Sequence, residues 1–466
     1  MATLRLIFAI AAAALMGGAP ALAQSCHPMQ SSAVGVDTGA SAVLPERCDQ
    51  PGECRIFDIG GHPIGEPGDF VIPGTASPGD LLAVERKRSG LQGYIDRAGA
   101  WKIEPQYKRV GPFCEDRAAA QRVDSRWIYV DRQGEQIGEP WDGAEAFTDG
   151  RGLVTVYKGG DKFLHGYIDA SGKVVIPAQF AAARLFSEGL AAVRVGDKWG
   201  YIDRDGNMAI APRFAEAEAF RGGRAVVRAS EGFAKNSGLI DRGGKFVVKP
   251  LYEQISKISD DGFWTLSITD PSYRGHGEPP LLSRVVDADG RFISGQSYSS
   301  VNGPAEGLMA ACRNDSCGFI DTHGKSVIAM KFKYAGDFQE GLAAVSTTGN
   351  RYGFIDREGK MVLPERYDGL GPGSEQFSAG PFVNGLAPAG CKGHWGFIDK
   401  GGAWAIPPVY RFAEAFENGF APVQTKTGTG HVRPDGSAID FDRSEMDEVS
   451  LPARPCGAPM ATGSPK

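Results

Sequence analysis

Aspartates that recur at a regular spacing are the residues of this chain whose types and positions most resemble a chemical site. The segments DRDG at 203–206 and DADG at 287–290 look like the start of a calcium-binding loop. Such a loop needs alternating oxygen ligands over about twelve residues and a closing glutamate. Most copies of the segment contain a single aspartate. The pattern therefore favours tight turns over calcium sites, and we predict no metal and no cofactor.

The eight cysteines are the second group of residues that could do chemistry. Cys48 and Cys54, and likewise Cys312 and Cys317, are predicted to face each other across the connection of a β-hairpin. Opposing Cβ atoms at such a connection come close enough to form a disulfide. The alternative is a zinc site made of Cys312, Cys317 and His323, which lacks the fourth ligand of a structural zinc site. We therefore predict the disulfides Cys48–Cys54 and Cys312–Cys317.

Sequence patterns of catalysis are absent from the chain. Its seven histidines are scattered, and it contains no HExxH, no GxSxG, no P-loop and no GxGxxG after a predicted strand. A triad assembled in space from distant residues stays open. The only support for an enzyme is that acidic residues recur in register. We predict no catalytic residue, and the sequence favours a protein that is not an enzyme.

The aspartates belong to a repeat that fills most of the chain. Copies of the segment Tyr/Phe-Ile-Asp-x-x-Gly, some clear and some degenerate, follow one another at spacings of 34 to 46 residues. Such near-constant spacing is typical of repeat architectures. The last glycines of the aligned copies are Gly61, Gly99, Gly134, Gly172, Gly206, Gly244, Gly290, Gly324, Gly359, Gly402 and Gly436.

One copy indicates what each repeat builds. Residues 189–196 and 198–203 predict two strands with a tight connection, because apolar and polar residues alternate in the second. Asp203 is expected to accept hydrogen bonds from the backbone N–H groups ahead of it, and Gly206 supplies a positive φ. A third strand ends at a proline such as Pro212, and a Phe-x-x-Gly-Leu loop closes the unit. Each repeat is therefore predicted to be a three-stranded antiparallel meander that buries its apolar face on its neighbours.

With this pattern, the chain resembles the WG-repeat (KWG-type) bacterial proteins. The resemblance is carried by Trp199-Gly200, by Trp395-Gly396 and by the repetition over roughly residues 50 to 440. We call the tryptophan position, seven residues before the aligned glycine, the Trp slot. Other copies depart from the pattern there, with Gln92, His165, Ser237, Ser283 and Tyr352. The resemblance implies a repeat scaffold with interaction surfaces and no particular reaction.

The expected fold is all-β, a tandem array of about eleven such meanders. The units could stack as an open, curved, solenoid-like array or close into β-propeller-like rings. Most propellers have four to eight blades, so we expect the open array. Cys26, Cys114, Cys391 and Cys456 allow three pairings. In an open array the two ends lie far apart, so we predict the local pairs Cys26–Cys114 and Cys391–Cys456.

The first residues are typical of a secretory signal peptide. They contain one early basic residue, a short apolar run and the small-residue ending Ala21-Leu22-Ala23. We expect cleavage after Ala23 and a periplasmic or secreted protein with no transmembrane segment. The signal peptide (1–23) is followed by an N-terminal segment (24–47), the repeat array (48–440) and a C-terminal tail (441–466).

The net charge and two insertions in the repeats bear on the partners of the protein. A net charge of −6, spread along the chain, argues against nucleic acid and anionic membranes. Two repeats carry about ten extra residues each, and we predict that Trp264, Tyr273 and Phe377 form exposed binding loops there. Tolerated drift of exposed loops is the competing explanation. The sequence favours an exported, non-catalytic scaffold that binds a protein or an envelope glycan, with an envelope-associated hydrolase as the alternative.

Overall fold

A computed structural model describes residues 81–96, 99–229, 237–274, 280–368, 380–417 and 419–439, together with Phe441, Ser444, Met446 and Cys456. For the strands before residue 81 it describes the backbone alone. The elements in this part of the chain are strands, which confirms the all-β prediction. No helix of the described residues is long and apolar enough to cross a membrane.

The strands pair antiparallel with their neighbours in sequence and form ten small sheets among the described residues. The first sheets are β1 (Glu46–Gln50), β2 (Glu53–Phe57) and β3 (Pro63–Ile64); β4 (Phe70–Val71), β5 (Leu81–Arg86), β6 (Leu91–Asp96) and β7 (Trp101–Tyr107); β8 (Arg109–Val110), β9 (Ala118–Gln121), β10 (Trp127–Val130) and β11 (Gln136–Trp141); and β12 (Gly143–Thr148), β13 (Arg151–Tyr157), β14 (Phe163–Ile168) and β15 (Val174–Phe180).

The next sheets are β16 (Ala182–Ala183), β17 (Leu190–Val195), β18 (Lys198–Asp203) and β19 (Met208–Phe214); β20 (Glu216–Ala217), β21 (Arg224–Arg228), β22 (Ser237–Asp241) and β23 (Phe246–Tyr252); β24 (Gln254–Lys257), β25 (Trp264–Thr269) and β26 (Leu281–Val286); and β27 (Ser300–Val301), β28 (Leu308–Arg313), β29 (Ser316–Asp321) and β30 (Ser326–Phe332).

The last part of the chain forms a seven-stranded sheet and a three-stranded sheet. They are β31 (Tyr334–Ala335), β32 (Ala343–Ser346), β33 (Arg351–Ile355), β34 (Met361–Asp368), β35 (Leu386–Cys391), β36 (His394–Asp399) and β37 (Trp404–Tyr410), followed by β38 (Phe412–Ala413), β39 (Ala421–Gln424) and β40 (Thr429–Val432). The seven-stranded sheet covers two successive repeats, which are joined by the single pair Asp368 and Gly390.

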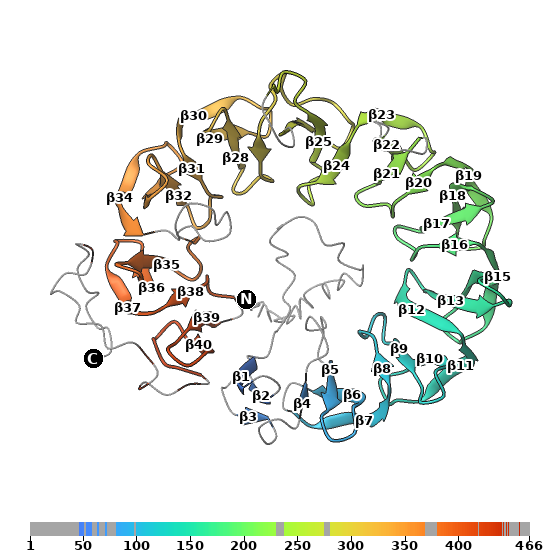
Figure 1. Ribbon diagram of the computed structural model, residues 1–466. Helices are drawn as coiled ribbons and strands as arrows, with labels where there is room; N and C mark the ends of the chain where they lie inside the picture. The colour runs from blue at the N-terminus through green and yellow to red at the C-terminus, as the bar shows by residue number, and fades with distance from the viewer. Residues whose placement is uncertain are drawn as a thin grey trace, which may run out of the picture.

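The sheets follow one another around a closed ring, like the blades of a β-propeller (Figure 1). Strand β40 contacts β1, so the end of the array meets its beginning. The expected open array is therefore wrong, and the alternative of a propeller-like ring describes the molecule. Each sheet packs on the next through similar contacts, so the angle between neighbouring sheets is similar at every step. These angles add up around the array until it closes.

Most sheets contain one strand more than the predicted meander. A two-residue strand, such as β16 before β17, precedes the three predicted strands and lies on the inner side of the ring (Figure 1). Two residues are too few to show an alternating pattern, so the sequence does not predict these strands. The last strand lies at the outer rim. Pro212 lies within β19 and does not end it, because this edge strand needs no donor at that position.

The predicted turn between the last two strands is confirmed. In the copy at 203–206, Asp203 Oδ1 accepts hydrogen bonds from the backbone N–H groups of Asp205 (3.0 Å) and Asn207 (2.9 Å). Gly206 has a φ of 86°, in the left-handed region that glycine adopts without steric cost. The recurrent aspartate is therefore a structural element of the turn.

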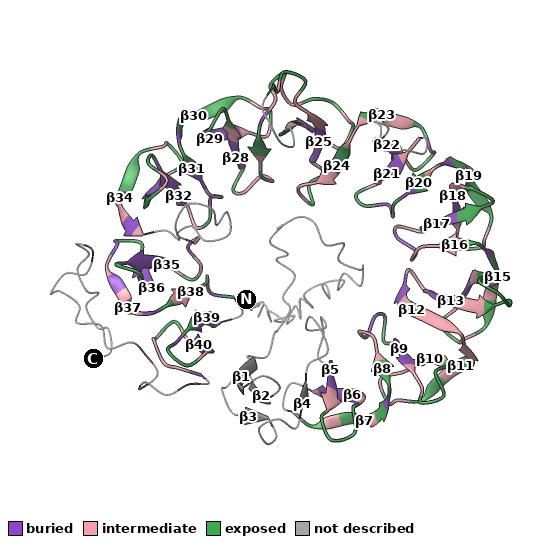
Figure 2. Ribbon diagram, viewed as in Figure 1, coloured by how far each residue is buried: buried purple, intermediate pink, exposed green. Residues whose placement is uncertain are grey.

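The core lies between neighbouring sheets. Figure 2 shows the buried segments on the middle strands and the exposed segments mainly at the rim. Tyr201 in β18 is 1% exposed and donates its hydroxyl hydrogen to the carbonyl oxygen of Glu218 in the next repeat at 2.7 Å. Its ring contacts Phe220 of that repeat at 4.9 Å between centroids. The Tyr of the repeated segment thus joins two sheets by packing and by a hydrogen bond.

In each sheet a loop joins the first strand to the second and reaches toward the interior of the ring (Figure 1). We call these loops the inner loops. In the inner loop after β16, Glu188 accepts hydrogen bonds from the backbone N–H groups of Gly222 and Gly223 in the next inner loop, at 2.5 and 2.8 Å. Arg242, which follows the turn aspartate of that next sheet, donates to the carbonyl oxygen of Glu188 at 2.6 Å. The residue after the turn aspartate thus links adjacent sheets.

Disulfides join two of the predicted cysteine pairs. Cys312 and Cys317 are bonded across the hairpin between β28 and β29, and Cys391 is bonded to Cys456. Cys48 and Cys54 lie opposite each other in the pairing of β1 with β2. Cys114 is also disulfide-bonded, whereas its predicted partner, Cys26, lies outside the described residues. Local pairing of the C-terminal tail therefore does not imply an open array, because it occurs here in a closed ring.

Candidate binding groove

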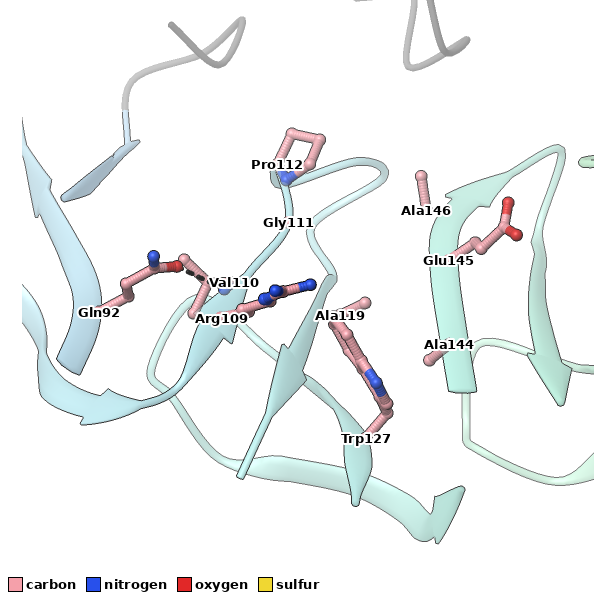
Figure 3. Close-up of a pocket in the computed structure, with 10 residues that line it drawn as sticks. All are labelled: Gln92, Arg109, Val110, Gly111, Pro112, Ala119, Trp127, Ala144, Glu145 and Ala146. Carbon is pink, nitrogen blue, oxygen red and sulfur yellow. Dashed lines mark hydrogen bonds between the residues drawn. The ribbon is translucent and has the colours of Figure 1, made fainter. Parts of the chain in front are cut away.

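A hollow of about 350 Å³ lies between two neighbouring sheets, one formed by β8 to β11 and the other by β12 to β15 (Figure 3). We call it the groove. Its wall combines polar and apolar groups of these two sheets, and Gln92 of β6 adds to it. The residues that line it are Gln92, Arg109, Val110, Gly111, Pro112, Ala119, Trp127, Ala144, Glu145 and Ala146.

Arg109 and Trp127 are placed in the groove by strand pairing. Arg109 begins β8 and lies opposite Gln121 of β9, and Trp127 begins β10 and lies opposite the same Gln121. Residues opposite each other on neighbouring antiparallel strands point to one face of the sheet. A cation and an indole therefore stand on one face, one strand apart, and Figure 3 shows both facing the space between the sheets.

The far wall explains why the groove is open. Trp127 occupies the Trp slot of its repeat, as Trp395 does in another copy. There the next sheet supplies Phe412, whose ring contacts the Trp395 indole at 5.4 Å between centroids. The position that matches Phe412, four residues before the phenylalanine of the inner loop, is Gly143 in the sheet that faces Trp127. With glycine in place of an aromatic ring, the half-buried indole stays open to the groove beside Ala144.

Arg109 is the polar group of the groove that is free to bind. Its side chain is exposed, and it makes no hydrogen bond or ion pair with the described residues. The amide of Gln92 is already used: its oxygen accepts from the Val110 N–H at 2.9 Å, and its nitrogen donates to Glu85 at 3.2 Å. The groove therefore offers one guanidinium, one indole and an alanine wall to a ligand.

Glu145 does not pair with Arg109. Figure 3 shows its carboxyl group on the side of β12 that faces away from Arg109 and Trp127. Partial burial of the carboxyl raises the pKa of Glu145, and the positive charge of Arg184 in the following sheet opposes the shift. The carboxyl group of Glu145 thus interacts with the following sheet, and among the described residues no ion pair compensates the positive charge of Arg109.

The comparisons with known proteins identify the repeat. The family described as WG containing repeat matches residues 93–127, 166–199, 199–231, 238–263, 318–350, 352–393 and 395–426, which together make up half of the chain. The chain belongs to the WG-repeat family. No curated protein matches it.

Solved structures that are similar to this WG-repeat chain share little sequence with it. A eukaryotic initiation factor is 9% identical, covering 80% of this chain and 98% of its own, with a TM-score of 0.40. BamB from Moraxella catarrhalis is 11% identical over 61% of this chain and 96% of its own, with a TM-score of 0.31. The WD40 β-propeller domain of Doa1 is 12% identical over 52% and 90%, with a TM-score of 0.24. With TM-scores this low, these proteins do not indicate what the chain does.

The predicted binding loops of the WG-repeat chain are not brought together in the structure. Trp264 is in strand β25 and 4% exposed, so the prediction that it lies on an exposed loop is wrong. It packs with Leu266 and Val286 of its own sheet and with Val226, Leu239 and Val248 of the preceding sheet. Tyr273 lies in the turn after β25 and is half-buried. Phe377 lies outside the described residues.

Sequence reasoning missed Arg109 and Trp127. Trp127 was recognised only as part of a degenerate copy ending at Gly134. The signal that could have found the groove is a tryptophan in the Trp slot followed, in the next repeat, by glycine where the copy after Trp395 has Phe412. In the described part of the WG-repeat chain, no three His, Cys, Asp or Glu side chains are placed to hold a metal ion. The groove itself combines groups suited to binding, with no nucleophile beside a base.

Proposed function

We propose that this WG-repeat chain is a non-catalytic scaffold that binds a protein partner at the groove. The observation that carries the proposal is the pair formed by Arg109 and Trp127, a cation without an ion pair among the described residues beside a half-buried indole that lines the groove. Tryptophan and arginine are the side chains most enriched at the energetic centres of protein interfaces. The repeat architecture supports the proposal, because stacked repeats expose extended binding surfaces.

A protein partner fits the groove better than an envelope glycan does. Sugars present many hydroxyl groups and need several hydrogen-bonding side chains, whereas Val110, Ala144 and Ala146 offer none. The amide of Gln92 is committed to its own neighbours. One free guanidinium and apolar walls suit a side chain of a polypeptide.

Site-specific photo-crosslinking tests the proposal. A benzophenone amino acid replaces Val123, a 61% exposed residue in the hairpin between β9 and β10, beside the groove. The matched control replaces Val327, a 46% exposed residue of β30 in a distant sheet. We expect a saturable protein adduct at position 123 that is absent at position 327.

Two outcomes would contradict the proposal. One is an equal yield of adducts at the two positions, which would mean that the groove is no special surface. The other is an adduct at position 123 that resists protease and is removed by glycosidases, which would assign the groove to a glycan.

We also propose that the scaffold acts outside the cytoplasm after removal of residues 1–23. The support is the leader-like composition of that segment. Mass spectrometry of the protein from its native source is expected to find Gln24 at the N-terminus. A chain that retains Met1 and fractionates with the cytosol would refute this part of the proposal.

A further inference from the structure

The surroundings of the groove are basic and aromatic, although the whole chain is acidic. The hairpin between β13 and β14 in the neighbouring sheet carries Tyr157 and Phe163, which pair across the two strands and are 49% and 48% exposed. Their rings lie 5.3 Å apart. Lys158 and Lys162 stand between them in sequence and are exposed. Large aromatic side chains exposed together in this way mark interaction surfaces.

This hairpin is tied to the groove by one aspartate. Asp142, just before β12, accepts a hydrogen bond from the backbone N–H of Tyr157 at 2.7 Å. The same carboxylate forms an ion pair with Arg126 at 3.2 Å, and Arg126 is the residue before Trp127. The aromatic hairpin and the Trp127 side of the groove are therefore adjacent parts of one surface.

The acidic residues of this surface leave an excess of positive charge. Asp142 is paired with Arg126, and Asp124 is paired with Arg122 at 3.0 Å. Three other cations make no ion pair with the described residues, against two acids near them, Asp161 and the groove-lining Glu145. These cations are Arg109, Lys158 and Lys162. Because the chain as a whole carries a net charge of −6, this local excess selects for partners of opposite charge.

We infer that the groove binds an acidic segment of the partner protein in which a carboxylate stands next to an apolar side chain. The carboxylate binds the guanidinium of Arg109, whose planar fork matches a carboxylate in two parallel hydrogen bonds. The apolar side chain lies between Trp127 and the wall formed by Ala144 and Ala146. Further acidic residues of the segment meet Lys158 and Lys162. The inference rests on the proposed function and specifies its ligand.

The volume of the groove supports a single anchoring side chain. About 350 Å³ is at the low end of the range for small-ligand pockets, and a single large side chain with its neighbouring carboxylate fits there. The rest of the segment then lies along the exposed hairpin. A nucleic acid would need a longer basic face than three cations provide.

Fluorescence anisotropy with two labelled peptides tests the inference on the full chain. The first probe is a fluorescein-labelled pentapeptide with a central Glu-Phe-Glu, and the second has Gln-Phe-Gln in its place. We expect the acidic probe to bind the wild type about tenfold more tightly than the amide probe, the value of one charge-assisted hydrogen-bonded pair. Binding should weaken with added salt, because the contacts are exposed.

The variants separate the groove from the general charge of the protein. Arg109→Gln is expected to lower the affinity for the acidic probe about tenfold. The double variant Lys158→Gln with Lys162→Gln is expected to lower it about threefold. Lys392→Gln is the matched control, because Lys392 is an exposed cation in a hairpin of a distant sheet. It removes the same charge and should leave binding unchanged. Unchanged thermal unfolding of all three variants shows that the fold is intact.

Several results would overturn the inference. They are equal affinity for the two probes, wild-type affinity in Arg109→Gln, an equal loss in Lys392→Gln, and no binding of the acidic probe at about 1 mM, where even weak peptide contacts are seen. The crosslinking experiment keeps the proposed function separate. If position 123 captures a protein through a neutral or basic segment, the scaffold function stands and the acidic specificity fails.

Discussion

The Trp slot shows how a single residue decides whether two sheets close on each other or leave a binding surface. Trp199 is covered by the guanidinium of Arg184, which lies 5.4 Å from the ring centroid. Trp395 is covered by Phe412 of the next sheet. Trp127 has no such ring or guanidinium over it; it is half-buried and lines the groove beside Ala144. The same position therefore joins neighbouring groups in these two repeats and lines the groove in another.

His165 occupies the Trp slot of another repeat and makes the stability of the ring depend on pH. Its Nδ1 lies 3.1 Å from the hydroxyl of Thr155 on the paired strand. Burial disfavours the imidazolium and lowers the pKa of His165, and the nearby charge of Arg194 adds to the effect. The folded protein therefore holds this ring in its neutral form.

The sign of the pH effect follows from the lowered pKa. The unfolded chain binds the proton more readily than the folded one, so stability is complete above about pH 6.5, the ordinary pKa of histidine, and falls as the pH decreases toward the folded pKa. We expect the free energy of unfolding of His165→Gln to decrease less on acidification than that of the wild type. The difference should be below about 1 kcal/mol, since the ring is only half-buried. Thermal unfolding between about pH 8 and pH 5 measures it.

His323→Gln is the control for this prediction. His323 is exposed in a turn, whereas His165 is half-buried within its sheet. The interpretation fails if the His165→Gln variant keeps the full acid-induced decrease in melting temperature and the His323→Gln variant loses it.

At the scale of elements, carboxylates link the inner loops of neighbouring sheets. Five inner loops carry an acidic residue with a positive φ, where a non-glycine residue is uncommon. They are Glu115, Asp149, Glu188, Glu306 and Glu340. Each carboxylate accepts a hydrogen bond from a glycine N–H of the following inner loop. Because the same contact recurs from sheet to sheet, it sets how successive sheets are placed.

Glu188→Gln tests the strength of this link. The amide keeps the size of the side chain but loses the negative charge that Gly222, Gly223 and Arg242 contact. We expect a loss of about 1–2 kcal/mol in the free energy of unfolding, the usual value for a charge-assisted hydrogen bond. Chemical denaturation of the purified protein measures the change.

The matched control is Glu358→Gln, an exposed glutamate in the turn of a later repeat that has no hydrogen bond or ion pair among the described residues. It should change stability by no more than about 0.5 kcal/mol, as surface substitutions usually do. Similar losses in the two variants would show that charge alone matters and that the contact between loops does not.

At the scale of the whole molecule, closure of the ring brings the two ends of the repeat array together. We expect high energy transfer between fluorophores placed at Glu46 in β1 and Thr429 in β40, because these strands are in contact. A pair at Glu46 and Lys245, in the turn between β22 and β23 across the ring (Figure 1), should transfer less. The reverse order would indicate an open array. The fluorophores are attached through azide-bearing residues, so the cysteines stay native.

The disulfides complete the description of the whole molecule. Non-reducing peptide mapping is expected to recover Cys312–Cys317 and Cys391–Cys456, the bonds present in the structure. It should also recover Cys48–Cys54 and Cys26–Cys114, the pairs predicted from the sequence. A bond between Cys26 and Cys456 would contradict this pattern, because Cys456 would then be unable to hold its tail against Cys391.

The sequence by itself determined the local structure of this protein. The turn at Asp203 and Gly206, the hairpin that brings Cys312 to Cys317, and the succession of similar sheets depend on residues a few positions apart. Hydrogen bonds within one turn and pairing across one hairpin follow from chain chemistry over that range. For this reason the predicted turns and strands are found in the structure, whereas the additional first strand of most sheets, usually two residues long, was not recognised.

Closure of the ring and the position of the groove were decided only by the tertiary structure. Closure depends on the angle between neighbouring sheets, which accumulates around the whole array and is not a property of any one repeat. Trp264 is buried because Val226, Leu239 and Val248 of the preceding sheet pack against it, whereas its insertion alone suggested an exposed loop. The groove combines Arg109 and Trp127 from one repeat with Ala144 from the next, so neither repeat contains it.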